Sequence, residues 1–208
     1  MANDKFTITD ALKYGWNSFK ANIPFFIGFM VVMGLLTVVP DVLSEKIFAP
    51  KSLGLTIAKL ILRLIGLVLG MASTRISLEL HDAGQPNLDK LKDLLPLIPS
   101  YIGGKILYGL IVLVGLILLI VPGIIVGYMF LYVGYLIIDR GLGPIDALQE
   151  SRALTDGYKM DLFLFSLAVA FINIAGVLCL FVGLFVTIPV TLMASVFVYR
   201  RLSPLEAA

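Results

Sequence analysis

Charged residues are scarce in this sequence. They make up 14% of its 208 residues, against about 25% in soluble domains. Two stretches contain none at all, namely the 33 residues between Lys105 and Asp139 and the 38 residues between Asp161 and Arg200. A straight helix of either length would measure roughly 50 to 57 Å, whereas the hydrocarbon core of a bilayer is ~30 Å thick. We therefore expect each stretch to fold back within the membrane as a transmembrane hairpin.

Residues that commonly act in catalysis or bind metal ions are also few. The single cysteine, Cys179, excludes an intrachain disulfide and a cysteine-based metal cluster. The single histidine, His81, has neither metal-ligand spacing nor a partnered nucleophile, and we expect it to be a solvated surface residue. No glycine-rich phosphate loop follows a strand, and no paired carboxylates lie within a membrane cavity. The sequence therefore predicts no enzyme activity, no cofactor and no metal site.

The hydropathy pattern predicts an all-α integral membrane protein with six transmembrane helices. The spans cover approximately residues 22–39, 53–75, 101–120, 123–138, 162–181 and 184–199. Pro122-Gly123 and Gly183 lie near the middle of the uncharged stretches and predict hairpin turns, because proline lacks a backbone donor and glycine allows turn conformations. Several spans are short, so hairpins that stop before the far surface are an alternative.

The distribution of Lys and Arg predicts the orientation. These residues precede the first span, follow the sixth, and occupy the segments between the second and third and between the fourth and fifth spans. With six spans, all these segments lie on one side, while the opposite side holds Lys46 and Lys51. Because cytoplasmic loops are enriched in Lys and Arg, we expect both termini to be cytoplasmic.

An internal repeat is suggested by short echoes in the sequence. Each predicted hairpin follows a short amphipathic segment that would lie along the membrane surface as an elbow helix, the first of them capped by Thr9. Residues 10–12 and 146–148 are both Asp-Ala-Leu. Six residues of the second hairpin recur 61 positions later: Ile111, Gly115, Leu119, Val121, Leu131 and Arg140. We therefore predict a single membrane domain, residues 1–208, built from three elbow-plus-hairpin units at about 9–80, 87–139 and 144–200.

The second span carries two basic residues, Lys59 and Arg63. They share one helical face with Gly66 and Gly70, a small-xxx-small pair that lets another backbone approach. We therefore expect helix packing at these glycines and an inward-pointing Arg63. No Asp or Glu lies in any other predicted span, and an isolated charge at this depth costs ~2.5 kcal/mol or more.

Two interpretations of Arg63 are open. In one, Arg63 snorkels outward beside Lys59 and meets Asp41, Glu45, water or ordinary headgroups. In the other, Lys59 and Arg63 hold an anionic group, such as a lipid phosphate, in a cavity between helices.

The fourth span has two different faces. Three glycines predicted to pack against another helix line one of them: Gly123, Gly127 and Gly134. Tyr128 and Tyr132 lie on the opposite face and are candidates for lining a polar cavity. In the fifth span Asn173 is a candidate ligand-binding residue and the polar side chain most suited to bridge two helices.

Four stretches of the second half resemble a superfamily of bacterial and archaeal multi-pass proteins. They are residues 120–124, residues 138–140 with Ala147, Leu148 and Ser151, residues 154–157, and residues 183–189 with Tyr199 and Arg200. The superfamily is that of the membrane domain of glycerophosphoryl diester phosphodiesterase and its stand-alone relatives, and residues 11–16 resemble its entry segment. The resemblance implies the cytoplasmic membrane of a prokaryote and nearness to lipid metabolism. It implies no catalytic residue, because the family's phosphodiesterase chemistry belongs to a separate soluble domain.

These patterns favour a non-enzymatic multi-pass protein that binds or moves an anionic lipid or amphiphile. One alternative is a structural or regulatory protein that acts through homo-oligomerisation or a membrane protein partner, and another is a small-solute channel. Membrane lipids are the expected partners. A net charge of +2 is too small and too dispersed to predict nucleic acid binding.

Overall fold

A computed structural model describes residues 6–47, 49, 52–86, 88–118, 120–179 and 182–203. These residues form helices joined by short connections, without a β-strand among them. The elements are α1 (Ile8–Ala21), α2 (Ile23–Ile47), α3 (Leu53–Ala83), the 3-10 helix η1 (Leu88–Leu97), α4 (Ile98–Leu118), α5 (Ile120–Met129), α6 (Val133–Arg140), α7 (Pro144–Thr155), α8 (Lys159–Leu178) and α9 (Leu184–Leu202).

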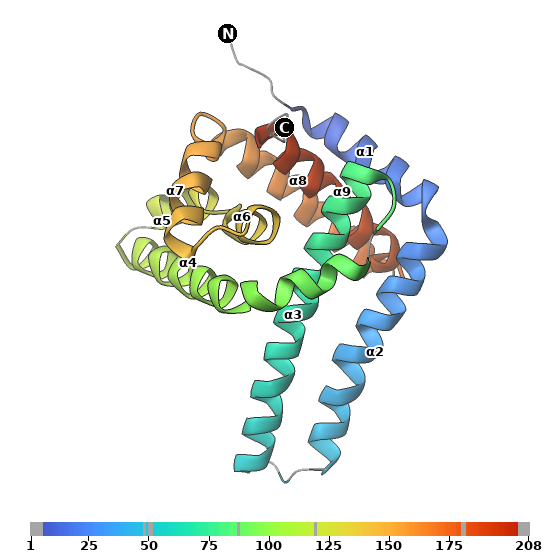
Figure 1. Cartoon of the computed structure of the whole chain (residues 1–208). Helices are drawn as coiled ribbons and strands as arrows, with labels where there is room; N and C mark the ends of the chain where they lie inside the picture. Colours follow the sequence, from blue (N-terminus) through green and yellow to red (C-terminus); the bar gives the residue numbers. More distant parts are fainter. Residues whose placement is uncertain are drawn as a thin grey trace.

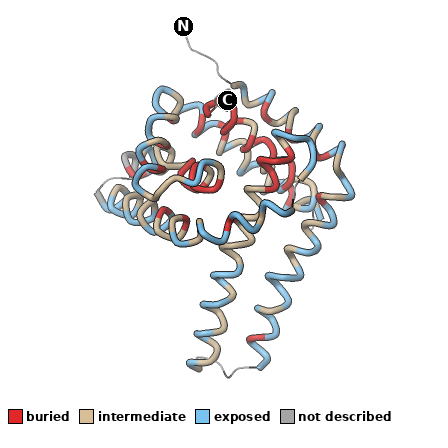
Figure 2. Tube along the Cα trace, in the orientation of Figure 1, coloured by how far each residue is buried: buried red, intermediate tan, exposed pale blue. Residues whose placement is uncertain are grey.

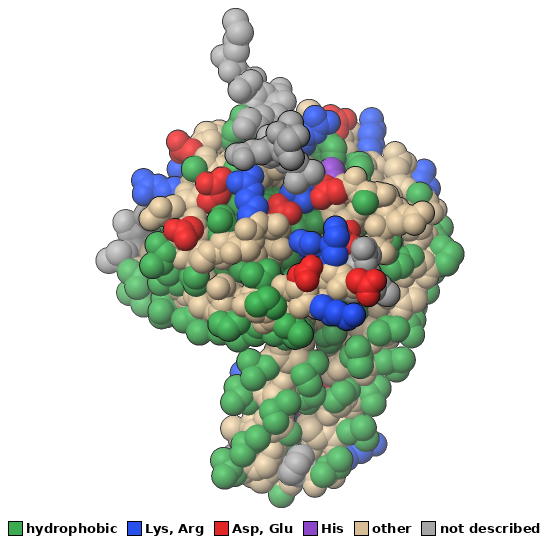
Figure 3. Space-filling model, in the orientation of Figure 1, with side chains coloured by type: hydrophobic (Ala, Val, Ile, Leu, Met, Phe, Trp, Pro, Cys, Tyr) green, Lys and Arg blue, Asp and Glu red, His purple; other side chains and the backbone are tan. Residues whose placement is uncertain are grey.

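Among the described residues, six helical segments are long and apolar enough to cross a membrane, which agrees with the predicted number of spans. They cover Ile23–Ile47, Leu53–Ala83, Asp89–Ile117, Gly123–Arg140, Lys159–Leu178 and Leu184–Leu202. The chain is thus a multi-pass membrane protein by length and composition. Charged side chains gather on the body at the end where α1 begins and α9 ends, and hydrophobic side chains cover most of the lower body and the hairpin below it (Figure 3).

The hairpin of α2 and α3 projects from the rest of the molecule (Figure 1). We call the projecting part, residues 28–47 and 53–70, the stalk. Stalk residues are almost all exposed or half-buried, whereas buried residues concentrate in the body around α6 and α9 (Figure 2). The apolar side chains of the stalk therefore have few partners within the chain, which suits contact with lipid or with another protein.

α1 is an amphipathic helix that lies across the body. Its N-cap is Thr7, whose hydroxyl accepts a hydrogen bond from Asp10 N at 3.1 Å, so the predicted cap at Thr9 is wrong by two residues. The helix ends at Asn22, and α2 begins at the next residue in a new direction. Its buried face, Ala11, Gly15 and Phe19, packs mainly against α9.

The body contains two further hairpins, α4–α5 and α8–α9. In the first, α4 ends at Leu118 and α5 begins at Ile120, so Pro122 and Gly123 lie in the opening turn of α5 and not between the two helices as predicted. Proline is tolerated there because the first turn of a helix needs no amide donors. The second begins its return helix just after Gly183, as the sequence predicted.

The fourth predicted span is not one continuous helix. α5 ends at Met129 and α6 starts at Val133, with turn residues between them. The second predicted elbow is a 3-10 helix, and the third is the α-helix α7, which begins at Pro144 as expected. α7 packs against α6 and α4 and reaches the break between α5 and α6.

Candidate functional site

The two predicted basic residues line a pocket between the stalk helices. Its volume is about 500 Å³. The lining residues are Thr37, Val38, Asp41 and Val42 from α2 and Lys59, Leu62 and Arg63 from α3. Arg63 is exposed, and the residues that line the pocket come from α2 and α3, so the side chain does not point inward as expected.

In the antiparallel hairpin of α2 and α3, two acidic side chains lie opposite two basic side chains in this pocket. Asp41 and Glu45 are one helical turn apart on α2, and Lys59 and Arg63 are one turn apart on the antiparallel α3. Nearer the loop, Lys59 Nζ lies 2.8 Å from Glu45 Oε1. One turn further in, Asp41 and Arg63 line the same pocket without forming an ion pair, and among the described residues no carboxylate pairs with the Arg63 guanidinium.

The predicted tyrosines lie elsewhere and in two different settings. Tyr128 lines an apolar pocket of about 440 Å³ between α5 and α8, with its ring centroid 5.7 Å from that of Phe163. Tyr132 is fully buried beyond the break and packs against Tyr135 and Tyr199, with centroids 5.7 and 5.5 Å away. The break after α5 separates the two side chains, so they do not form one tyrosine-lined face.

Asn173 joins α8 to α9. Its Nδ2 donates to Val169 O at 3.0 Å and lies 3.4 Å from Thr191 Oγ1. A role as an interhelical bridge therefore fits the geometry. Asn173 shares no pocket with Lys59 or Arg63, so the five residues predicted to bind a ligand do not form a single site.

The glycines predicted to pack differ in their surroundings. A Cβ added at Gly123 would lie 2.6 Å from Leu116 N, and one at Gly134 would lie 3.1 Å from the Tyr101 ring, so both face α4 closely. Gly127 faces α4 more loosely, 3.8 Å from the Tyr108 hydroxyl. A Cβ at Gly66 or Gly70 would meet nothing within 4 Å. Close packing at that pair remains a prediction about another molecule.

Other glycines also make close contacts, which sequence reasoning missed. A Cβ at Gly15 would overlap the carbonyl oxygen of Val190, so α1 and α9 touch backbone to backbone there. In the third hairpin, a Cβ at Gly183 would lie 2.7 Å from Gly176 O. The second hairpin has a similar approach, with a Cβ at Gly115 3.0 Å from Gly123 Cα. Small residues thus allow the two helices of each body hairpin to approach each other closely.

The ends of α3, α6 and α9 meet in a buried ion cluster, which we call the Arg200 cluster. Arg200 Nε donates to Asp82 Oδ1 at 3.0 Å, and its Nη2 donates to Asp139 Oδ1 at 2.8 Å. Tyr199 donates its hydroxyl to Asp139 Oδ2 at 2.8 Å. The Arg200 side chain is 7% exposed and Asp139 9%, whereas Asp82 is more accessible at 25%, so one buried guanidinium neutralises a buried and a partly exposed carboxylate.

His81 lies beside the Arg200 cluster and is half-buried, so it is less solvated than expected. Its Nδ1 lies 3.1 Å from Asp82 Oδ1, and its ring lies 5.0 Å from that of Tyr14 and 6.4 Å from that of Phe197. Burial raises the pKa of the Tyr14 phenol above its ordinary value. His81 therefore belongs to the packing between α1, α3 and α9.

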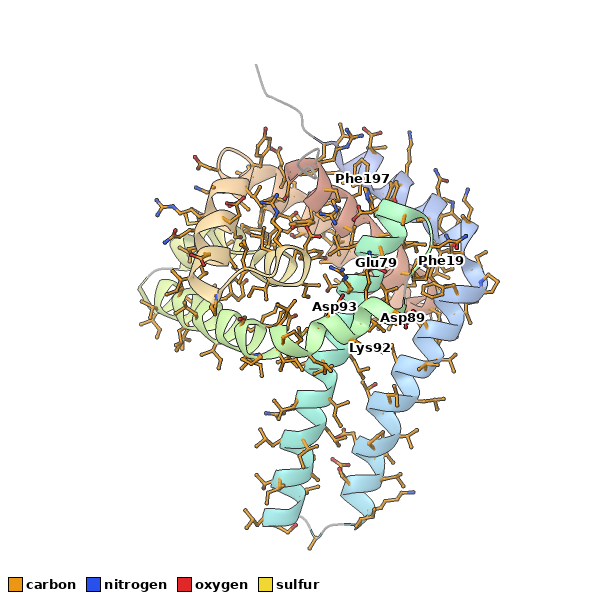
Figure 4. All side chains as sticks on the ribbon, in the orientation of Figure 1. Phe19, Glu79, Asp89, Lys92, Asp93 and Phe197 are labelled. Carbon is orange, nitrogen blue, oxygen red and sulfur yellow. The ribbon has the colours of Figure 1, made fainter. Side chains whose placement is uncertain are left out.

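A second group of charges lies on the neighbouring part of α3. Glu79 lies beside η1, the segment that carries Asp89, Lys92 and Asp93 (Figure 4). Glu79 Oε1 is 3.4 Å from Lys90 Nζ and 3.2 Å from Arg75 Nε. These contacts tie η1 to α3, so this group of charges holds the body together.

Side chains of α7 satisfy the backbone at the break between α5 and α6. Ser151 Oγ donates to Met129 O at 3.1 Å and accepts from Tyr132 N at 3.2 Å. Thr155 Oγ1 lies 3.1 Å from the same Met129 oxygen. Backbone groups released by a break must find such partners where water is excluded. The break is thus fixed by hydroxyls from another helix.

Replacing Ser151 with alanine is expected to lower the free energy of unfolding by about 1 to 3 kcal/mol, because the Tyr132 amide loses its acceptor while remaining buried. Equilibrium unfolding in detergent measures the change. Ser100→Ala is the control, since Ser100 is half-buried and outside the break. Equal stabilities of the two variants would contradict this role of Ser151.

Three features therefore stand out in the described part of the chain. The Arg200 cluster and the capped break have complete sets of partners and stabilise the body. No three His, Cys, Asp or Glu side chains converge as metal ligands among the residues described. The stalk pocket differs because it combines an unpaired guanidinium with apolar walls. It is the feature best suited to bind an amphiphile.

Comparison with known proteins places the chain in a family. Residues 35–206 match the family described as "Protein of unknown function (DUF975)". The uncharacterized proteins Rv2560 of Mycobacterium tuberculosis and Mb2590 of Mycobacterium bovis are each 29% identical to the chain over 109 residues. That alignment covers 50% of this chain and 34% of each relative, so the chain spans about a third of the length of the curated relatives it matches. No solved structure matches the chain. Because the family match covers most of its length, the chain belongs to the DUF975 family.

Proposed function

We propose that this protein is a non-enzymatic membrane protein that binds or moves an amphiphile, and that the anionic part of the headgroup contacts Arg63 in the stalk pocket. The observation that carries the proposal is the unpaired guanidinium of Arg63 on a mostly apolar hairpin. An isolated charge within a membrane span is costly. A phosphate offsets that cost by accepting two parallel hydrogen bonds from the guanidinium.

The walls of the pocket support an amphiphile over a free anion. Val38, Val42 and Leu62 line it beside the charged groups. Exposed leucines, isoleucines and valines continue along both stalk helices. Acyl chains can therefore lie along the stalk while the headgroup occupies the pocket. Lys59 is already paired with Glu45, which leaves Arg63 as the principal contact for a phosphate.

Orientation and repeat structure form part of the same proposal. The start of α1 and the end of α9 lie at one end of the molecule, away from the tip of the stalk (Figure 1). This arrangement supports two cytoplasmic termini, in the cytoplasmic membrane of a prokaryote. The similar glycine contacts that close the α4–α5 and α8–α9 hairpins support a repeat of the second and third predicted units. Relation to the glycerophosphoryl diester phosphodiesterase membrane domain remains a prediction.

A second candidate function is assembly with another copy or with a membrane partner. Gly66 and Gly70 favour it, since they form a small-xxx-small pair on the stalk, and a Cβ added at either would meet no atom of the described part of the chain within 4 Å. Native mass spectra of the detergent-purified protein give the number of chains directly. A dimer that persists without lipid would support this second role.

Replacing Arg63 with glutamine is expected to weaken the binding of phosphatidylglycerol about tenfold, because one charge-assisted hydrogen bond contributes roughly 1.5 kcal/mol. Native mass spectrometry of delipidated protein titrated with the lipid measures the dissociation constant. Lys46→Gln is the matched control, because Lys46 is an exposed base of the same hairpin and does not line the pocket. Equal lipid retention by wild type and Arg63→Gln would refute the proposal.

A further inference from the structure

The stalk pocket contains opposite charges held apart at the same level of the hairpin. Glu45 and Lys59 meet directly at 2.8 Å. One turn further in, Asp41 and Arg63 are in equivalent register and line one pocket, yet no ion pair joins them. The pocket volume of about 500 Å³ lies between these two helices. A ligand that enters it meets a carboxylate on the α2 side and a guanidinium on the α3 side.

The charge balance of the pocket argues against a simple anion. Lys59 pairs with Glu45 and is also attracted by Asp41, and Asp41 and Arg63 are the two charged lining residues without an ion pair. A ligand with a phosphate alone would gain Arg63 and be repelled by Asp41, which lines the same pocket. A ligand that carries a phosphate and an ammonium group a few bonds apart would satisfy both side chains.

Hydrogen bonding on the α2 side also favours a donor group in the ligand. The Thr37 hydroxyl, one turn from Asp41, donates its proton within its own helix, to Met33 O at 2.8 Å. Its oxygen lone pairs remain available to accept a hydrogen bond. Asp41 and Thr37 therefore present acceptors to the pocket, and a primary ammonium group has three N–H donors to match them.

We infer that the stalk pocket takes the headgroup of an aminophospholipid, with the phosphate at Arg63 and the primary ammonium at Asp41. This inference rests on the proposed function and specifies its ligand class. Primary and quaternary ammonium groups differ here, because a quaternary group has no N–H to donate to Asp41 or Thr37. Phosphatidylethanolamine is therefore preferred over phosphatidylcholine, and also over phosphatidylglycerol, which has no cationic group.

The test compares these three lipids, with identical acyl chains, on delipidated full-length protein by native mass spectrometry. Phosphatidylethanolamine is expected to bind about threefold to fivefold more tightly than either of the others, the effect of one partly exposed charge pair. Asp41→Asn should abolish this preference. Glu45→Gln should free Lys59 and raise binding of phosphatidylglycerol. Asp41 and Glu45 are exposed, so neither change should affect folding.

The outcomes separate the inference from the function on which it rests. If wild type binds phosphatidylglycerol as tightly as phosphatidylethanolamine, or if Asp41→Asn keeps the preference, the aminophospholipid assignment is overturned. The proposed function survives that result provided Arg63→Gln still weakens phosphatidylglycerol binding. If Arg63→Gln leaves all three lipids unaffected, both proposals fail. Lys46→Gln, outside the pocket, should retain the full preference for phosphatidylethanolamine.

Discussion

Methionine in place of Arg200 is expected to destabilise the protein by about 3 to 5 kcal/mol. The guanidinium is the shared partner of Asp82 and Asp139, and its removal leaves two neighbouring carboxylates without a counter-charge, one of them, Asp139, only 9% exposed. Methionine has much of the volume of arginine, so the loss of stability measures the missing charge and hydrogen bonds more than a change in packing. Unfolding of the detergent-solubilised protein, followed by near-ultraviolet circular dichroism, measures the change.

A neighbouring residue supplies the control for this substitution. Arg201 is exposed and lies over the Phe197 ring, 5.0 Å from its centroid, without an ion pair among the described residues. Arg201→Met should therefore cost about 1 kcal/mol or less. Adding Asp139→Asn to Arg200→Met should recover part of the stability, because it removes one of the two unpaired charges. No recovery, or equal losses for Arg200→Met and Arg201→Met, would show that the cluster does not act as described.

The second large effect is expected at Gly15. A Cβ there would overlap the carbonyl oxygen of Val190 and lie 3.1 Å from Ala194 N, and both are backbone atoms that cannot rotate away. Gly15→Ala therefore forces α1 off α9. Because α1 buries its apolar face mainly against α9, we expect a loss of about 3 kcal/mol or more in the free energy of unfolding.

The same substitution at Gly28 provides the control. A Cβ at Gly28 would meet nothing within 4 Å, and alanine is the better helix former. Gly28→Ala should leave stability unchanged or raise it by about 0.5 kcal/mol. If Gly15→Ala melts at the temperature of wild type, the close contact between α1 and α9 is not required for the fold.

The number of spans could be predicted because lipid imposes a strict condition on the sequence. The two long uncharged stretches could cross a bilayer only by folding back, and each contains a hairpin. The exact bend of the first hairpin was wrong, because Pro122 is equally acceptable in the first turn of a helix. The hydropathy pattern thus predicted the number of spans correctly, but it did not locate the bend of the first body hairpin.

Features that depend on distant partners could not be predicted in this way. The break between α5 and α6 has no proline, and it is stabilised by Ser151 and Thr155 from a later helix. Arg200 was interpreted only as a positive charge outside the last span, although it pairs with Asp82, 118 residues earlier. One signal was available: Asp82 and Asp139 each stand two residues before a glycine with positive φ that ends the helix, Gly84 and Gly141.

The charged residues of the stalk could be predicted only in part. Sequence spacing put Lys59 and Arg63 on one face and gave Asp41 and Glu45 as possible neighbours. The structure pairs Lys59 with Glu45 and leaves Arg63 facing a pocket that Asp41 shares. Both earlier interpretations of Arg63 had treated the two bases alike. Their different roles follow from the register of the hairpin, which the sequence does not specify.

The contact between α1 and α9 has a consequence for biosynthesis. Gly15 and Val190 touch, yet 175 residues separate them along the chain. At a translation rate of about 5 to 20 residues per second, α1 leaves the ribosome roughly 10 to 35 seconds before its partner exists. During that interval the nascent α1 needs another surface for its apolar face, and the membrane interface beside the translocon suits an amphipathic helix. The contact of α1 with the body is therefore completed only after α9 has been synthesised.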